Sequence, residues 1–462
     1  MNRKNLIGIF ILAVILPFML LTSCTTKQNW TQFRGSEGTM SVTASGLPTE
    51  WGTGKNVLWS ADLNGTGYSS PVVWGTKVFI TSTFPEKVNP APERPAGPPP
   101  QAVQGPQGGQ AAQQGQRPPQ PAGPPVPEVR DTSYMNEIYK WEVICFDLAT
   151  GRENWRQVAY QGAPKAGKNQ NSTYACETPV TNGKQIVASF GMHGIFCYDM
   201  EGNLIWQKDP GVYYTQRGWG TGSSPVIYND KVFIQADNEE NSFLLALDIA
   251  TGNELWRVTR DEKTTYSTPF IWKNKSGTEL VTTGKTARSY DPETGKLLWE
   301  LKLGGEQVIP SPTGDEELLY LGNAGGREAK SVLFAVKAGT SGEVAWQTEE
   351  SGLANPSPLL YNGLLYVIGS RGEIAVLDAT DGSLKYQKRI TGIGSVWSSP
   401  WAFNERVYFF DENGTTRVFK AGPAFEQVAE NSLEGNKFWA SVAVAGDAYI
   451  FRSGDKLYCI KN

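Results

Sequence analysis

Side chains suited to chemistry are few in this chain of 462 residues. The one histidine, His193, lies between glycines in Gly191-Met192-His193-Gly194. A single imidazole can neither build a multi-histidine metal site nor alternate with a second histidine as acid and base. We therefore interpret His193 as a structural hydrogen-bonding residue, with an acid–base role as the alternative. Catalysis would need carboxylates, lysine, tyrosine or a bound cofactor, and the sequence favours a protein without an active site.

The cysteines and the net charge restrict the classes of function that the sequence allows. Cys145, Cys176, Cys197 and Cys459 follow the amino-terminal segment, and no two cysteines are adjacent. In an oxidising compartment they would permit up to two disulfides, and free buried thiols are the alternative. The 42 Lys and Arg against 46 Asp and Glu give a formal charge of -4, which offers no basic footprint for a nucleic-acid backbone.

Polar and aromatic side chains in predicted turns and connectors form the candidate binding face. Mixed charges and aromatic rings with flexible glycine suit a binding funnel, whereas the alternative is a solvated surface of charged hairpin turns. The candidates are His193, Asp237, Arg288, Arg327, Arg371, Arg217, Trp219 and Trp397. They converge only if the connections that carry them share one face, so the strands between them decide whether the site exists.

A repeated phrase supplies those strands. Ser-Ser-Pro followed by a short β-rich run occurs at Ser69-Ser70-Pro71, Ser223-Ser224-Pro225 and Ser398-Ser399-Pro400, and five related copies bring the number to eight. From Pro179 to Val442 the copies recur every 42 to 46 residues. This period is typical of a four-stranded propeller blade. The sequence therefore predicts an all-β fold, an eight-bladed β-propeller with four-stranded antiparallel blades.

A second phrase places an aromatic residue at the outer edge of a blade. Asp147-Leu148-Ala149-Thr150-Gly151 is followed by Trp155, and similar phrases precede Trp256 and Trp299. Asp and Thr side chains cap a tight turn, Gly takes a positive φ, and the aromatic ring can pack against the neighbouring blade. We expect this docking role for Trp59, Trp155, Trp206, Trp256, Trp299 and Trp346.

The two ends of the repeat region are predicted to meet. The last unit, from Ser441 to Ile460, stops without its fourth strand, while Asn56-Val57-Leu58-Trp59-Ser60 resembles an orphan fourth strand. We expect this amino-terminal strand to complete the last blade and to remove an exposed edge.

An insertion at residues 85–130 interrupts the first blade. Residues 85–127 hold nearly half of the 29 prolines, with many Gln and Gly and no aromatic residue, so they cannot bury a core. We expect a disordered loop. It is interpreted as a solvated elaboration, with a partner-binding arm as the alternative.

Residues 1–23 are typical of an export signal. Arg3 and Lys4 precede a long apolar run that ends in Leu21-Thr22-Ser23-Cys24. Small residues before a cysteine resemble a bacterial lipobox, in which Cys24 is lipidated and becomes the new amino terminus. An ordinary cleaved signal and an uncleaved membrane anchor are the alternatives. Residues 24–462 are then a single lipid-anchored propeller domain, and the absence of Asp after Cys24 favours the outer membrane by resemblance to the known sorting rule.

The phrase Asp-x-x-Thr-Gly-x-x-x-Trp resembles the tryptophan-docking motif of the pyrroloquinoline-quinone-like (PQQ-like) β-propeller repeat proteins. The resemblance covers about residues 30–462 apart from the insertion. Two better-understood members imply different functions. Quinoprotein alcohol dehydrogenases hold the quinone and Ca²⁺ in the propeller beneath a pair of adjacent cysteines, which this chain lacks. BamB is an eight-bladed lipoprotein of the outer-membrane β-barrel assembly machinery.

The opening Trp30-Thr31-Gln32-Phe33-Arg34-Gly35 resembles neither member and is similar to a large bacterial branch of PQQ-like propellers. The combined expectation is an exported, lipid-anchored, monomeric propeller at the outer membrane. It would serve as a non-catalytic binding or scaffold protein with protein partners, as in outer-membrane protein assembly, and without a cofactor or metal. The alternatives are an oxidoreductase that depends on PQQ and calcium, and a carbohydrate- or peptide-binding propeller.

Overall fold

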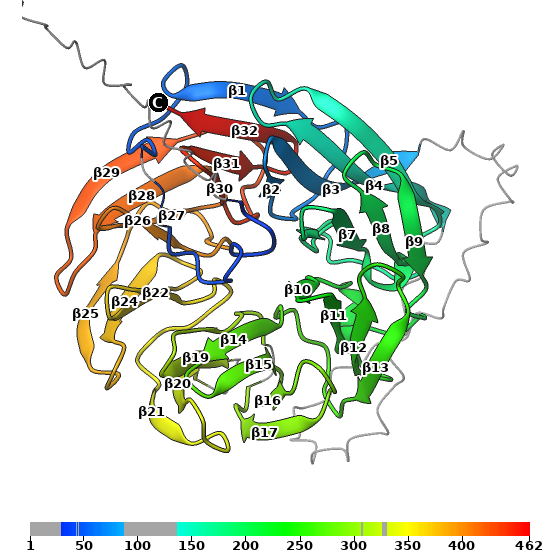
Figure 1. Ribbon diagram of the computed structural model, residues 1–462. Coiled ribbons are helices and arrows are strands. Elements are labelled where there is room, and N and C mark those ends of the chain that lie inside the picture. Colours follow the sequence, from blue (N-terminus) through cyan, green and yellow to red (C-terminus); the bar gives the residue numbers. More distant parts are fainter. Residues whose placement is uncertain (1–28, 43, 45, 87–135, 306–307, 326–329) are drawn as a thin grey trace, which may run out of the picture.

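The computed structural model describes residues 29–42, 44, 46–86, 136–305, 308–325 and 330–462. Their strands form eight four-stranded antiparallel sheets. Figure 1 shows these sheets as blades around a central axis. The predicted eight-bladed β-propeller is therefore confirmed.

The blades follow the chain, and the first strand of each blade lies nearest the axis, beside the first strands of the neighbouring blades. Blade 1 consists of β2 (Val72–Trp74), β3 (Lys77–Glu86), β4 (Ile138–Asp147) and β5 (Glu153–Gly162). Blade 2 consists of β6 (Val180–Thr181), β7 (Gln185–Ser189), β8 (Ile195–Asp199) and β9 (Leu204–Lys208). Blade 3 consists of β10 (Val226–Tyr228), β11 (Lys231–Ala236), β12 (Phe243–Asp248) and β13 (Glu254–Thr259). Blade 4 consists of β14 (Phe270–Asn274), β15 (Gly277–Thr282), β16 (Thr286–Tyr290) and β17 (Leu297–Lys302).

The second half of the disc repeats the pattern. Blade 5 consists of β18 (Thr313–Gly314), β19 (Leu318–Asn323), β20 (Val332–Lys337) and β21 (Val344–Thr348). Blade 6 consists of β22 (Leu359–Tyr361), β23 (Leu364–Ile368), β24 (Glu373–Asp378) and β25 (Leu384–Arg389). Blade 7 consists of β26 (Trp401–Phe403), β27 (Arg406–Phe410), β28 (Thr415–Lys420) and β29 (Gln427–Ser432). Blade 8 consists of β30 (Ala443–Ala445), β31 (Ala448–Arg452), β32 (Lys456–Lys461) and β1 (Val57–Asp62). The described residues include two short 3₁₀ helices in connections, η2 (Gly191–His193) and η3 (Gln216–Gly218).

The disc closes as the sequence predicts. Strand β1 pairs antiparallel with β32, and Trp59 lies opposite Cys459. Figure 1 shows β1 and β32 side by side at the junction of the two ends of the repeat region. The fourth strand of the last blade is thus supplied from the other end of the chain, which leaves that blade with the same four strands as the others.

Side-chain burial follows the distance from the axis. The middle strands β11 and β12 are buried at most positions, whereas the outer strand β13 alternates between exposed and half-buried residues. This pattern is expected where middle strands are covered on both faces by neighbouring blades and the outer strand borders solvent.

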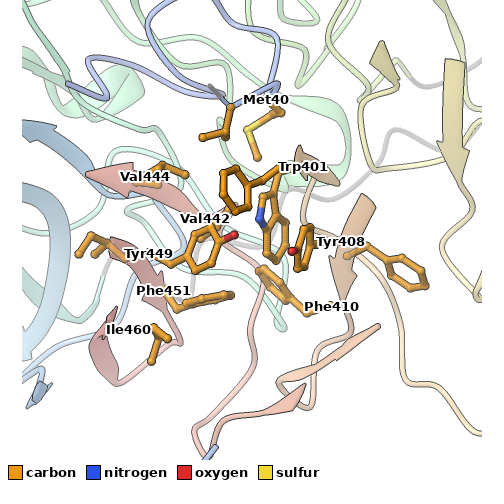
Figure 2. Close-up of a cluster of buried hydrophobic side chains, with 14 of the residues drawn as sticks. Met40, Trp401, Tyr408, Phe410, Val442, Val444, Tyr449, Phe451 and Ile460 are labelled. Atoms are coloured by element: carbon orange, nitrogen blue, oxygen red, sulfur yellow. The ribbon is translucent and has the colours of Figure 1, made fainter. Parts of the chain in front are cut away.

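Large aromatic side chains fill the space between blades 7 and 8. Trp401 and Tyr408 stack with ring centroids 5.2 Å apart, and Tyr449 and Phe451 of blade 8 lie within 6 Å of Trp401. Figure 2 shows this cluster with Met40, which comes from the segment that precedes the blades. The amino-terminal segment is therefore part of the core and helps to hold the disc together.

Several sequence predictions fall outside the described residues. These are the export signal at residues 1–23, the lipidation site Cys24, candidate Arg327, and all but the first two residues of the insertion at 85–130. The insertion follows β3, which ends at Glu86 and precedes β4 in the blade. Within the described ranges, the cysteines Cys145, Cys176, Cys197 and Cys459 are free thiols. The same ranges contain no helix that is long and apolar enough to cross a membrane.

Candidate functional site at the propeller axis

Eight hydroxyl side chains, one from each blade, form a closed ring of hydrogen bonds around the axis. The backbone N–H of Ser70 donates to Oγ1 of Thr178 in the next blade at 2.9 Å, and the N–H of Ser441 donates to Oγ of Ser70 at 3.0 Å. The six bonds between them repeat this pattern at 2.9 to 3.3 Å. The members of this hydroxyl ring are Ser70, Thr178, Ser224, Thr268, Ser311, Ser357, Ser399 and Ser441.

The residue two positions before each ring member forms a second tier, the axial rim. Alternate residues of an extended chain point to the same side, so ring and rim side chains both face the axis. The ring residues are buried and the rim residues are partly exposed. The rim consists of Tyr68, Cys176, Gly222, Tyr266, Ile309, Asn355, Trp397 and Trp439.

Ring and rim enclose a cavity of about 140 Å³, the axial cup. The rim belongs to the connections that enter the first strand of each blade. Because successive strands alternate in direction, the cup opens on the face that also carries the turns between second and third strands. We call this the open face.

Three aromatic rings from consecutive blades form one wall of the cup. Trp397 and Trp439 stack with centroids 4.2 Å apart and planes inclined by 23°. Tyr68 also packs against Trp439, with ring centroids 4.8 Å apart and planes inclined by 35°. The Nε1–H of Trp439 donates to the Glu412 carboxylate at 3.2 Å, and the Lys437 ammonium lies 5.1 Å from the Trp439 ring centroid. This wall presents flat apolar surface with fixed orientation, which suits stacking of a planar ligand group.

The floor of the cup comes from the amino-terminal segment, which crosses the opposite mouth of the channel. Trp30 bridges to Val73 in blade 1, and the backbone N–H of Thr181 in blade 2 donates to the carbonyl of Thr31 at 2.9 Å. Phe33 then lines the cup from below. The cup is therefore closed at its base, and a ligand enters from the open face.

Two buried guanidinium groups flank the hydroxyl ring. Arg34, from the floor segment, donates to the carbonyls of Pro312 at 2.6 Å and Pro358 at 2.8 Å. Arg452 in β31 donates to the Ser69 carbonyl at 3.0 Å. Neither forms an ion pair with a described carboxylate, and burial lowers the pKa of each to about 9. Both remain cations at neutral pH without a negative partner in the described chain, which is unusual for buried arginine.

A buried carboxyl lies next to the ring and points away from the cup. Glu177 precedes ring member Thr178, and its carboxylate accepts a hydrogen bond from the Thr221 hydroxyl. Burial raises the pKa of Glu177 to about 7. Its side chain lines a separate cavity of about 20 Å³ together with Asp237, which has room for one water.

Among the predicted face residues that the structure describes, Trp397 alone lines the axial cup. Its side chain is 36 % exposed, so it marks the accessible edge of the aromatic wall. Arg217 and Arg371 are exposed on the open face, and the Arg217 guanidinium lies 5.2 Å from the ring centroid of Trp219. The open face therefore brings together part of the predicted set around the cup.

His193 is buried in blade 2 as a hydrogen-bonding residue. Its Nε2 accepts from the backbone N–H of Lys165 at 2.9 Å, and its ring stacks on Trp141 with centroids 4.2 Å apart. Burial lowers its pKa to about 4, so the imidazole is neutral at physiological pH. A neutral imidazole that holds a backbone amide has a structural role in this arrangement.

Asp237 and Arg288 are also held inside the protein. Asp237 accepts two hydrogen bonds from Arg260, at 2.7 and 3.1 Å, with both side chains completely buried. The sequence prediction placed Arg288 in a turn, but it lies within β16, where its Nη1 donates to Glu262 at 2.6 Å. That prediction was wrong because β16 begins at Thr286 and includes Arg288 as its third residue. Charged partners contributed by a neighbouring loop keep both residues buried.

Most of the cup was missing from the sequence-based site. The sequence identified the Ser-Ser-Pro phrases as strand starts. It did not show that the second hydroxyl of each phrase joins a ring, because the ring forms only when eight copies close around one axis. Taking the residue two positions before that hydroxyl in all eight repeats would have identified the rim. No local signal identifies Arg34 or Arg452, because their partners lie more than 270 residues away in the sequence.

The described cup does not fit PQQ with Ca²⁺. A calcium site needs six to eight oxygen ligands, among which carboxylates are the usual charged ones. The cup lining contains no Asp, Glu, Lys or Arg, and no cluster of three His, Cys, Asp or Glu side chains suited to a metal exists among the described residues. Its volume of about 140 Å³ is also below the roughly 300 to 1,000 Å³ that drug-sized ligands and cofactors occupy.

Comparisons with known proteins agree on the repeat architecture. The family described as "Outer membrane protein assembly factor BamB" matches residues 139–272 and 275–461. A curated BamB of Yersinia pestis is 29% identical over 109 residues, which are 21% of this chain and 26% of that protein. The matched segment thus spans about a quarter of the curated relative.

Two solved structures share the fold at low identity. BamB from Moraxella catarrhalis superposes with a TM-score of 0.54 and 13% identity, covering 69% of this chain and 91% of that one. A europium-containing methanol dehydrogenase gives a TM-score of 0.58 and 12% identity, covering 94% and 98%. At these identities the likeness concerns the fold alone.

Proposed function

The chain belongs to the PQQ-like propeller family described as outer membrane protein assembly factor BamB, and from this premise we propose that it is a non-catalytic binding and scaffold protein of the cell envelope. In this proposal it is exported, anchored through lipid on Cys24 at the outer membrane, and takes part in outer-membrane protein assembly. Its partners are envelope proteins, which it binds on the open face around the axial cup.

The observation that carries the proposal is the aromatic wall at the mouth of the cup. Tyr68, Trp439 and Trp397 present stacked rings at the centre of the open face. Aromatic side chains at the centre of a surface dominate binding energy in protein interfaces, because they bury a large area at low entropic cost. A propeller holds such a wall rigid, so little ordering cost opposes binding.

The chemistry of the cup supports binding over catalysis. A general acid or base requires a titratable group within reach of the substrate. The titratable side chains in the lining are Cys176 and the phenols of Tyr68 and Tyr266, and burial raises the pKa of all three. A protonated thiol and neutral phenols are hydrogen-bonding groups at neutral pH and lack an adjacent base in the lining.

Site-specific photo-crosslinking in intact cells tests the proposal. A photoreactive residue replaces Arg371 or Trp219 on the open face, or Lys184 in the turn between β6 and β7 on the opposite face as the matched control. We expect crosslinks to outer-membrane assembly proteins from positions 371 and 219 and none from position 184. Crosslinks confined to position 184, or none from any position in a folded and exported protein, would overturn the proposal.

The quinone-dependent oxidoreductase stays as the second candidate because the europium-containing methanol dehydrogenase shares the fold over 94% of this chain. Calorimetric titration with PQQ, with and without Ca²⁺, separates the two functions. Saturable one-to-one binding strengthened by Ca²⁺ would favour the oxidoreductase. We expect no saturable binding, because the cup is smaller than a cofactor pocket and its lining has no carboxylate ligand for calcium.

A further inference from the structure

We propose that the axial cup binds a carboxylate that carries an aromatic group, with the carboxylate on the hydroxyl ring and the aromatic group against the Tyr68, Trp439 and Trp397 wall. The proposal deepens the binding function above and rests on it. The same chemistry has two sources, a free aromatic acid or the carboxyl end of a polypeptide whose last residue is aromatic.

The ring hydroxyls offer unused hydrogen-bond donors to the cup. Each ring hydroxyl already accepts the N–H of the preceding blade, as Thr178 accepts from Ser70. A hydroxyl carries one O–H donor in addition to its lone pairs. For none of the eight does an acceptor for that O–H exist among the described residues, so the donors are available to a ligand in the cavity that all eight line.

Tyr266 adds a donor of the same kind. Its side chain lines the cup, and its hydroxyl is buried without a hydrogen-bond partner among the described residues. A buried polar atom without a partner destabilises the folded protein, so such atoms are rare and call for an explanation. A ligand oxygen inside the cup would supply the missing acceptor.

The sign of the surrounding charge selects an anion. Arg34 and Arg452 carry positive charge beside the ring at Pro312 and at Ser69, and neither has a carboxylate partner in the described chain. In each guanidinium the Nε–H has no acceptor among the described residues, and in Arg452 Nη2 also lacks one. The cup lining contains no acidic residue. Both cations would attract a carboxylate on the hydroxyl ring through a medium of low dielectric, where the attraction is stronger than in water.

The carboxylates of Glu177 and Glu412 lie near the cup but do not serve as the anion on its hydroxyl ring. Glu177 hydrogen-bonds to Thr221 and faces the smaller cavity beside the ring. The Glu412 carboxylate accepts a hydrogen bond from the Trp439 Nε1–H and does not line the cup. Since neither lines the cup, the space over the hydroxyl ring is left for an anion from outside the described chain.

The size and the closed base of the cup define how much of a ligand enters. A dry cavity of about 150 Å³ accommodates one benzene molecule, and the cup has a volume of about 140 Å³. Phe33 closes the base, so a chain cannot thread through the disc. The cup therefore accepts one ring-sized group or one chain end, with the rest of a longer ligand on the open face.

Calorimetric titration with matched acids and amides tests the proposal on the propeller with its amino-terminal segment. The probes are phenylacetate against phenylacetamide, and the peptide Gly-Gly-Phe with a free carboxylate against its carboxamide. We expect each acid to bind at least about tenfold more tightly than its amide, since a hydrogen bond to a charged group contributes about 1.5 to 3 kcal/mol. Equal affinity of acid and amide, or no binding of either acid, would overturn the proposal.

Two variants assign the binding to the cup. Tyr266→Phe removes only the unpartnered hydroxyl, so we expect the Kd for the preferred acid to rise about tenfold, with an unfolding temperature that is unchanged or slightly higher. Arg452→Met removes one buried cation and should weaken the acid without weakening the amide. Tyr228→Phe is the matched control, because the Tyr228 hydroxyl contacts Thr278 away from the cup at 3.3 Å. An unchanged Kd in Tyr266→Phe would contradict the assignment, even if Arg452→Met proves unstable.

The same titrations distinguish a free aromatic acid from a polypeptide end, and they distinguish failure of the carboxylate proposal from failure of the scaffold function. Tighter binding of phenylacetate than of the peptide supports a free acid, and the reverse supports a chain end. If neither acid binds while position 371 still crosslinks to envelope proteins, the carboxylate proposal fails and the scaffold function stands. If both results are negative, both proposals fail.

Discussion

The outer edge and the axis of the disc join the same eight blades by different means. At the outer edge a tryptophan packs on the turn of the next blade, as Trp206 donates its Nε1–H to the Ile249 carbonyl at 2.8 Å. Gly252 of that turn lies so close that a Cβ there would come within 2.6 Å of the Trp206 ring. At the axis, small hydroxyls and backbone amides replace the aromatic contact. The outer contacts are apolar and fill space, whereas the axial contacts are polar and leave a cavity.

This difference separates stability from binding. Three of the six outer tryptophans, Trp59, Trp206 and Trp299, are each less than a tenth exposed, and the other three are half-buried. The axial tryptophans Trp397 and Trp439 are partly exposed and stack on each other. The same residue type therefore stabilises the fold at the edge and is available to a ligand at the centre.

Replacing an outer tryptophan should have the largest effect. Trp206→Ala is expected to lower the free energy of unfolding by about 3 to 5 kcal/mol, because it removes a buried ring and leaves a cavity between blades 2 and 3. Trp397→Ala at the axis should cost about 1 kcal/mol, the contribution of one stacked pair. Denaturant unfolding measures both. Equal losses would show that the edge and the axis do not differ in this way.

The outer glycine tests the same contact from the opposite side. Gly252 and Gly363 both have a φ of +72°, but a Cβ added at Gly363 would meet no atom within 4 Å, whereas one added at Gly252 would meet the Trp206 ring. Gly363→Ala should therefore cost about 1 kcal/mol for the left-handed backbone alone. Gly252→Ala should cost a further 1 to 3 kcal/mol, roughly, through the clash with Trp206. Thermal unfolding of the pair checks this, and similar losses would contradict the docking contact.

Near the axis, stability should depend on pH through Glu177. Its pKa of about 7 in the folded protein is above its usual 4.5, so the folded state holds the proton more tightly than the unfolded state. The stabilisation is complete below about pH 4.5 and is lost as pH rises through 7, by up to about 3 kcal/mol. Glu177→Gln should remove this slope. The variant is compared with the original chain at each pH between 4.5 and 8, and a constant difference in unfolding free energy would refute the assignment.

The comparison with the original chain is needed because His193 has the opposite slope. Its pKa of about 4 in the folded protein is below the usual 6.5, so the stabilisation from the neutral imidazole is present above pH 6.5 and is lost as pH falls through 4. The two slopes partly cancel between pH 4.5 and 6.5. A difference between two chains that both contain His193 removes this contribution.

The sequence predicts the outer edge better than the axis, for a physical reason. An outer contact requires a turn and a tryptophan a few residues apart, as in the phrase from Asp248 to Trp256, and such a phrase is legible within one repeat. An axial contact requires one residue from each of eight blades, and the floor requires Arg34 to reach Pro358 across 324 residues. The fold and its closure through β1 were therefore predictable. The cup depended on which residues the closed disc brings together.

The smallest effect should come from the hydroxyl ring itself, and two neighbouring serines isolate it. Ser224 Oγ accepts the backbone N–H of Thr178 at 3.0 Å, whereas the adjacent Ser223 Oγ is buried without a partner among the described residues. Ser224→Ala leaves a buried N–H unpaired and should cost about 1 to 2 kcal/mol, while Ser223→Ala should be neutral or slightly stabilising. Chemical denaturation of both variants provides the test.

Each of the eight bonds in the ring is weak. The loss of one bond should therefore loosen the ring locally without opening the disc, because the outer tryptophans still hold the blades together. A cooperative collapse in Ser224→Ala would instead place the stability of the propeller at its axis.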